Sequence, residues 1–182
     1  MTLPRSKSTR IRMLTLLALT AAALSACTPT PEPTPTPTAA FASEEEAFAA
    51  AEEVYRAYND ALNEVDVSDA STFEALYALT SGDFEAADRK TFSQLQAENY
   101  TLWGEARVAL FQGKEATEPY KEITALVCVD VSNSGISDEK GRSVVPSDRP
   151  DINALRVTFV NAGGDLLIDH ADREESSSCA SS

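Results

Sequence analysis

The sequence contains few of the residues on which most enzyme sites depend. Its 182 residues include one histidine, one tryptophan and three cysteines, and fifteen basic side chains stand against twenty-nine acidic ones. The motifs HExxH, GxGxxG and GxSxG are absent, so no metal site, nucleotide site or serine nucleophile is indicated, and we expect no cofactor. The shortage of basic side chains argues against nucleic acid as a partner, because a phosphate backbone binds cationic faces.

The chain also lacks a long hydrophobic run. Residues 13–24 form an uncharged stretch, MLTLLALTAAAL, that is shorter than the ~20 apolar residues needed to cross a bilayer. The twelve residues before it contain four basic side chains and no acidic one. A positive segment followed by a short apolar one is the layout of a secretory signal.

Leu24-Ser25-Ala26-Cys27 ends this run and resembles the lipobox of bacterial lipoprotein precursors. The resemblance implies cleavage before Cys27, a diacylglyceryl group on its thiol, and a domain anchored to the cell membrane on its extracytoplasmic side. The alternative is a plain secretory signal with Cys27 near the cut by chance. Residues 28–38, TPTPEPTPTPT, favour an extended polyproline II spacer whose threonines are candidate glycosylation sites. This spacer and the alanine-rich composition of the chain are similar to those of actinobacterial lipoproteins.

These features predict four parts: a signal peptide at 1–26, the lipidated cysteine and linker at 27–42, one folded domain at 43–175, and a tail at 176–182. Without the signal, eleven basic residues face twenty-nine acidic ones, a net charge of −18. The acidic residues are spread along the chain, which indicates a solvated acidic surface rather than an acidic site.

The cysteines have two uses in this scheme. If Cys27 carries the lipid, Cys128 and Cys179 remain as an even pair in an oxidising compartment, where a disulfide is the default. Such a bond would tie a strand to the C-terminal tail. Reactive-thiol chemistry is the alternative, although neither cysteine has a histidine or a basic cluster beside it.

Hydrophobic periodicity predicts three helices followed by strands. The helices are expected at 44–64, from a capping box at Ser71 to Gly82, and over 84–98, where Phe84, Asp88, Thr91, Phe92 and Leu95 recur at helical spacing. The strands are expected at 100–110, 122–131, 152–160 and 166–171, with a turn from Gln112, a hairpin at 161–165, and a short strand at 144–145 inside the connection 132–150.

This order predicts an α+β domain with three helices packed on a curved, mainly antiparallel sheet of four to five strands. Over residues 43–172 it resembles the nuclear transport factor 2-like superfamily, which implies a sheet wrapped around the long first helix and a cone-shaped pocket. That superfamily includes isomerases, dehydratases, small-ligand binders and structural modules, so the resemblance leaves the activity open. A cystatin-like sheet with a single helix fits less well, because two further helices precede the strands.

Four residues are candidate acid–base groups in such a pocket. His170 has Asp172 on the same strand face and could act as a general base, or it could be one of the exposed residues of a polar strand end. Asp130 could lie against apolar surface, with a raised pKa, beside Tyr55 or Tyr58. Against this, Asp130 begins a polar loop, and both tyrosines fit the apolar stripe of the first helix.

Trp103 and Arg107 are four residues apart on the less apolar face of the first strand. They form either an interaction surface or part of the packing under a helix. The prediction is a non-enzymatic module at the cell envelope that binds an envelope protein or a small apolar ligand. The alternative is a tethered enzyme of the isomerase or dehydratase type, with a pocket carboxylate or histidine as its general base.

Overall fold

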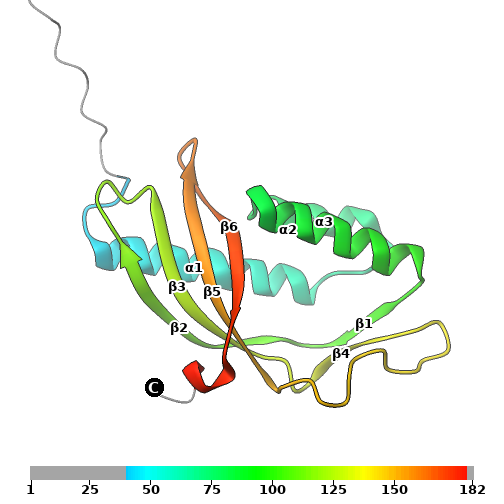
Figure 1. Ribbon diagram of the computed structural model, residues 1–182. Coiled ribbons are helices and arrows are strands. Elements are labelled where there is room, and N and C mark those ends of the chain that lie inside the picture. The colour runs from blue at the N-terminus through cyan, green and yellow to red at the C-terminus, as the bar shows by residue number, and fades with distance from the viewer. Residues whose placement is uncertain (1–39, 180–182) are drawn as a thin grey trace, which may run out of the picture. The chain divides into compact units, whose positions relative to one another are not determined.

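The computed structural model describes residues 40–179 (Figure 1). The predicted signal peptide, the lipobox with Cys27 and most of the linker lie outside the described residues. One compact unit spans Thr36–Ser182 and contains every buried residue of the described part, so a fragment with these bounds carries the complete core. Within residues 40–179, no helix has both the length and the apolar character required to span a membrane.

The first helix follows the sequence prediction closely. Helix α1 spans Glu44–Asn63, and its N-cap Ser43 accepts a hydrogen bond from the backbone N–H of Glu46 at 3.1 Å. Ala47, Ala51, Tyr55, Tyr58 and Asn59 are its buried residues. These positions repeat at intervals of three and four, so one face of the helix enters the core.

The second predicted helix differs from the structure at both ends. It consists of a 3-10 turn, η1 (Ala70–Phe73), followed by the short helix α2 (Glu74–Tyr77). Its N-cap is Asp69, whose carboxylate accepts from the Ser71 N–H at 3.0 Å, so the predicted cap at Ser71 was wrong. Aspartate caps a helix as well as serine does, and here it lies two residues earlier. Gly82 does not end this helix but begins the next, α3 (Gly82–Ala97).

Two antiparallel sheets follow, which confirms the α+β class. The larger has the order β2-β3-β5-β6, formed by β2 (Arg107–Ala116), β3 (Glu122–Asp130), β5 (Ile152–Ala162) and β6 (Asp165–Glu174). The smaller pairs β1 (Thr101–Gly104) with β4 (Ser134–Ser137). In Figure 1, α1 runs across one face of the larger sheet, while β1 and β4 extend below α3.

The strand predicted at 100–110 is therefore two strands in different sheets. The break falls at Glu105 and Ala106, where the backbone of Ala106 bonds to helix α1 instead of to a strand. Asn63 accepts from the Ala106 N–H at 2.9 Å, and the side-chain amides of Asn59 and Asn63 both donate to its carbonyl, at 3.0 and 2.9 Å. These three bonds satisfy the polar groups that a continuous ladder would have paired.

Three further strand predictions need correction. Gln112 does not begin a turn, because β2 continues to Ala116, and Gly113 lies under the ring of Phe48 from α1. The short strand in the long connection is β4, at 134–137, rather than at 144–145. The hairpin turn is tighter than predicted, since β5 ends at Ala162 and β6 begins at Asp165.

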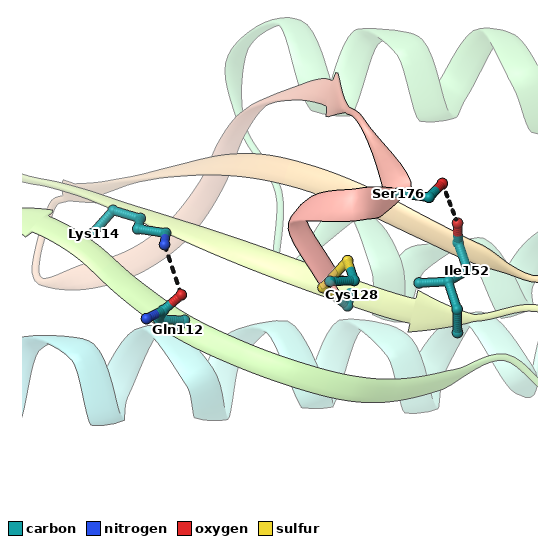
Figure 2. Close-up of a disulfide and its surroundings, with 6 residues drawn as sticks. Gln112, Lys114, Cys128, Ile152 and Ser176 are labelled. Atoms are coloured by element: carbon teal, nitrogen blue, oxygen red, sulfur yellow. Dashed lines mark hydrogen bonds between the residues drawn. A yellow bond between two sulfur atoms is a disulfide. The ribbon is translucent and has the colours of Figure 1, made fainter. Parts of the chain in front are cut away.

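The predicted disulfide between Cys128 and Cys179 is present. Cys128 lies in β3 on the face of the sheet that is turned away from the main core, in a small apolar cluster with Leu126 and Ala154. Figure 2 shows the C-terminal 3-10 turn η2 (Ser176–Cys179) across this face. There the Ser176 hydroxyl donates to the Ile152 carbonyl at 3.1 Å. The bond holds the chain end against the sheet.

Candidate ligand pocket

A pocket of about 320 Å³ lies where α1 and α3 face the β1–β4 ribbon. Its walls are mostly apolar and come from all four of these elements. The polar groups among them are few, and they stand on different walls. The apolar lining includes Leu62, Val65, Phe92, Leu95, Leu102, Trp103, Val131 and Ile136, and the polar side chains are Tyr58, Asn63, Asp88, Thr91, Ser134 and Arg149.

Tyr58 and Asp88 form a hydrogen-bonded pair in this pocket. The Tyr58 hydroxyl donates to Asp88 Oδ2 at 3.0 Å, from α1 to α3. Tyr58 is only 7% exposed, and its ring meets the edge of Phe84 with the centroids 5.3 Å apart. This packing fixes the phenol, so its hydroxyl is aimed at the carboxylate rather than at water.

Burial changes the acidity of both groups. It raises the pKa of Asp88 to about 6, although the hydrogen bond from Tyr58 acts in the opposite direction. Burial, with the Asp88 charge adding to it, raises the pKa of Tyr58 well above its usual range. The pair therefore consists of a tyrosine that keeps its proton and a carboxyl group that titrates close to neutral pH, which is the range useful to a general base.

Trp103 forms the rim of the pocket. It is 47% exposed and pairs with Gly135 across the β1–β4 ribbon. A Cβ atom on Gly135 would collide with the indole, so the ring lies directly over this glycine. Trp103 is the one tryptophan of the chain, and its fluorescence therefore reports on this rim alone.

Arg149 reaches the same pocket from the segment before β5. Its Nη2 donates to the carbonyl oxygens of Val131 and Ser134, the latter at 2.7 Å, which holds the guanidinium at the turn between β3 and β4. The side chain is half-buried. Among the described residues, no carboxylate oxygen lies within 4.0 Å of it.

Of the four acid–base candidates from the sequence, Tyr58 alone lines this pocket. Tyr55 is a core residue, 4% exposed, whose pKa is raised by burial. Asp130 accepts from the backbone N–H and the hydroxyl of Ser132, and these bonds lower its pKa, whereas the sequence suggested an increase. His170 lies on an exposed part of β6 with Asp172 at 3.2 Å, the neighbour that strand alternation predicts.

Trp103 and Arg107 line two different hollows, which have Asn63 and Ala106 in common. Arg107 is exposed and pairs with Glu105 at 3.0 Å beside the more polar hollow. The break between β1 and β2 separates the two residues, because the chain changes sheets at that point.

Asp88 was recognised in the sequence only as one position of the third helix. It was nevertheless detectable, because a carboxylate occupied a position in the stripe of Phe84, Phe92 and Leu95 that faces the core. An acidic side chain at such a position must find a donor or change its pKa. The sequence did not indicate a role for Arg149, because it lies in a polar segment without hydrophobic periodicity.

No protein-family model matches the sequence, and no curated protein is significantly similar to it. Solved structures do match. A protein assigned as an aromatic ring hydroxylase, from Novosphingobium aromaticivorans, is 12% identical, with a TM-score of 0.53 over 72% of this chain and 90% of that one. The intermembrane space region of the chloroplast protein ARC6 is 9% identical, with a TM-score of 0.50 over 69% and 95%. These likenesses concern the backbone alone, and with the element order they show that the domain has the nuclear transport factor 2-like α+β fold.

Proposed function

We propose that this protein is a lipid-anchored extracytoplasmic binding protein that takes a small, mainly apolar ligand into the pocket between α1, α3 and the β1–β4 ribbon. The observation that carries the proposal is the pocket itself. Its volume of about 320 Å³ lies within the range of small-molecule sites, and it has the usual composition of apolar walls with a few polar groups. The pocket favours a small ligand over an envelope protein as the bound partner.

The anchor rests on the sequence Leu24-Ser25-Ala26-Cys27. We expect the full chain, produced in a lipoprotein-processing bacterium, to incorporate an alkyne-tagged fatty acid. Cys27→Ser should abolish the label, because no thiol remains for the diacylglyceryl group. Cys179→Ser is the matched control and should stay labelled. Equal labelling of the two variants would contradict the proposed anchor.

Ligand binding is tested with N-phenyl-1-naphthylamine, a neutral apolar fluorophore, added to residues 36–182. We expect saturable binding that quenches Trp103. Thr91→Phe places a large side chain among the pocket residues of α3 and should weaken binding about tenfold, since an occupied volume cannot also hold a ring. Gln94→Phe adds the same group to the same helix outside the pocket and should change little. Similar affinities for both variants would place binding elsewhere.

A second function is favoured by the pair of Asp88 and Tyr58. A carboxyl group with a pKa of about 6 could remove a proton from a bound substrate near neutral pH, while the tyrosine orients it. This is the isomerase or dehydratase alternative, with Asp88 as the base in place of Asp130 or His170.

The pKa of Asp88 has a measurable effect on stability. Its pKa is higher in the folded state than the ordinary aspartate value of 3.8, so the folded state binds the proton more tightly. Stability should therefore fall as pH rises from about 4 to about 6 and remain lower above that range. Asp88→Asn removes this loss and should raise the free energy of unfolding at pH 7 by roughly 1 kcal/mol, a value reduced for the partial exposure of the group.

Urea unfolding of the wild type and Asp88→Asn at pH 4 and pH 7 measures this difference. The two proteins should differ most at pH 7 and much less near pH 4, where Asp88 is protonated in the folded state and only partly ionised in the unfolded state. Glu53→Gln, an exposed change on α1, controls for the general loss of a negative charge. If Asp88→Asn were less stable at pH 7, the ionised carboxylate would have to be favourable in the folded protein.

A further inference from the structure

Arg149 is one of the cationic residues between 40 and 179 that have no carboxylate partner. Seven arginines lie between residues 40 and 179, and five of them pair with a carboxylate: Arg56, Arg89, Arg107, Arg142 and Arg156. Arg149 and Arg173 do not. Of these two, Arg149 alone lines the apolar pocket.

Carboxylates are abundant in this chain, so the lack of one beside Arg149 requires an explanation. The formal net charge of the chain is −14, and Asp148 and Asp151 flank Arg149 closely in the sequence. Neither carboxylate lies within 4.0 Å of the guanidinium, because both carbonyl bonds hold Arg149 toward the turn between β3 and β4. A cation in a half-buried site without a counter-ion is costly, so a bound anion would be favoured there.

The guanidinium of Arg149 also has N–H groups that make no hydrogen bond to the described residues. Arginine carries five N–H groups, and the two bonds to Val131 and Ser134 both come from Nη2. Within residues 40–179, Nε and Nη1 have no hydrogen-bond partner. Three donors therefore remain, and each can donate a charge-assisted hydrogen bond to an oxygen of a carboxylate or sulfonate.

The pocket lining also contains a group of the opposite charge on another element. Asp88 belongs to α3, whereas Arg149 bonds to Ser134 at the start of β4, and Leu95 and Leu102 line the same pocket. An anionic group would be attracted to the arginine and repelled by the ionised carboxylate. The two charges would therefore favour one orientation of an anionic ligand.

We propose that the ligand is a small organic anion, with an apolar ring or chain along Leu95, Leu102 and Trp103 and a carboxylate-like head that pairs with Arg149. This inference rests on the proposed function, because it requires that the pocket bind a small molecule. It adds the charge class of the ligand and its orientation.

Two fluorophores with the same body test the charge preference. 1-Anilinonaphthalene-8-sulfonate carries an anionic group, and N-phenyl-1-naphthylamine is its neutral counterpart. In wild-type residues 36–182, quenching of Trp103 should show that the anion binds about tenfold more tightly, as expected for a charge-assisted pair. This ratio is measured on the unmodified sequence, so it tests the proposal whether or not a variant folds.

Arg149→Met should remove the preference by weakening the anion about tenfold, with no change for the neutral probe. Arg149→Lys keeps the charge but has fewer N–H donors and no planar guanidinium, so it should retain part of the preference. Arg142→Met is the matched control, because Arg142 is exposed and pairs with Asp138. Circular dichroism checks that each variant is folded.

The outcomes separate the two proposals. If neither probe binds, the proposed function fails. If both bind with equal affinity in the wild type, or if Arg149→Met weakens them equally, the pocket binds ligands but the anionic inference is overturned. If Arg142→Met lowers the preference as much as Arg149→Met does, the effect is one of general charge, which also overturns it.

Discussion

Loss of the bond between Cys128 and Cys179 is expected to lower the free energy of unfolding by about 4 kcal/mol. The two cysteines are 51 residues apart, and the bond restricts a loop of this length in the unfolded chain. In the folded state it holds η2 on the sheet, where the Ser176 hydroxyl also donates to the Ile152 carbonyl (Figure 2). Without the disulfide, the unfolded state gains conformational freedom.

Urea unfolding of residues 36–182, carried out with and without a thiol reductant, measures this loss. Cys128 is only 1% exposed, so the reductant must act on the unfolded chain or on an opened form. Cys179→Ser supplies the same state without reduction, and its midpoint should not respond to the reductant. Identical midpoints for the wild type and Cys179→Ser would mean that the bond contributes nothing.

Gly104→Ala should be destabilising by about 3 kcal/mol, and the pocket should change with it. Gly104 has φ of +74°, a backbone conformation that costs an alanine roughly 1–2 kcal/mol. A Cβ atom there would also collide with the carbonyl oxygen of Asn133, which is backbone and cannot rotate away. The ribbon of β1 and β4 must separate at this point to make room.

Gly141→Ala is a matched control that measures the cost of placing an alanine at a positive φ. Gly141 also has φ of +74°, but a Cβ atom there meets nothing within 4 Å. The difference between the two variants in urea unfolding is therefore the cost of the collision with Asn133. Because Trp103 precedes Gly104, its emission should shift in Gly104→Ala and stay unchanged in Gly141→Ala. Equal destabilisation of Gly104→Ala and Gly141→Ala would show that β1 and β4 can move apart at little cost in free energy.

The sequence predicted those features that depend on neighbouring residues. The capping box at Ser43 and the apolar stripe after it locate α1 to within one residue of its end. The even pair of cysteines that remains once Cys27 is set aside predicted the disulfide. Local hydrogen bonding would also have corrected one error, because an aspartate two residues before a serine, as in Asp130 and Ser132, forms an Asx turn that lowers the pKa.

The remaining features depend on residues that are far apart in the sequence. The break between β1 and β2 is made by Asn63, which bonds Ala106 across 43 positions, and alternation in the sequence continues through it. The pKa of Asp88 is raised by burial in the folded domain, and its hydrogen-bond partner Tyr58 lies 30 positions away on α1. Such partners become identifiable only when the helices are placed.

The position of the pocket along α1 has a consequence for how the domain can be tethered. The described chain enters beside Pro119, whose carbonyl accepts from the Ala40 N–H at 3.4 Å, close to the first residue of the helix. Tyr58 and Leu62, which line the pocket, belong to the last two turns. At ~1.5 Å per residue, the eighteen steps along the helix from Glu44 to Leu62 cover roughly 27 Å. The helix therefore separates the two ends, so the proposed attachment at its start and the proposed ligand exchange at its end would use different surfaces and need not obstruct one another.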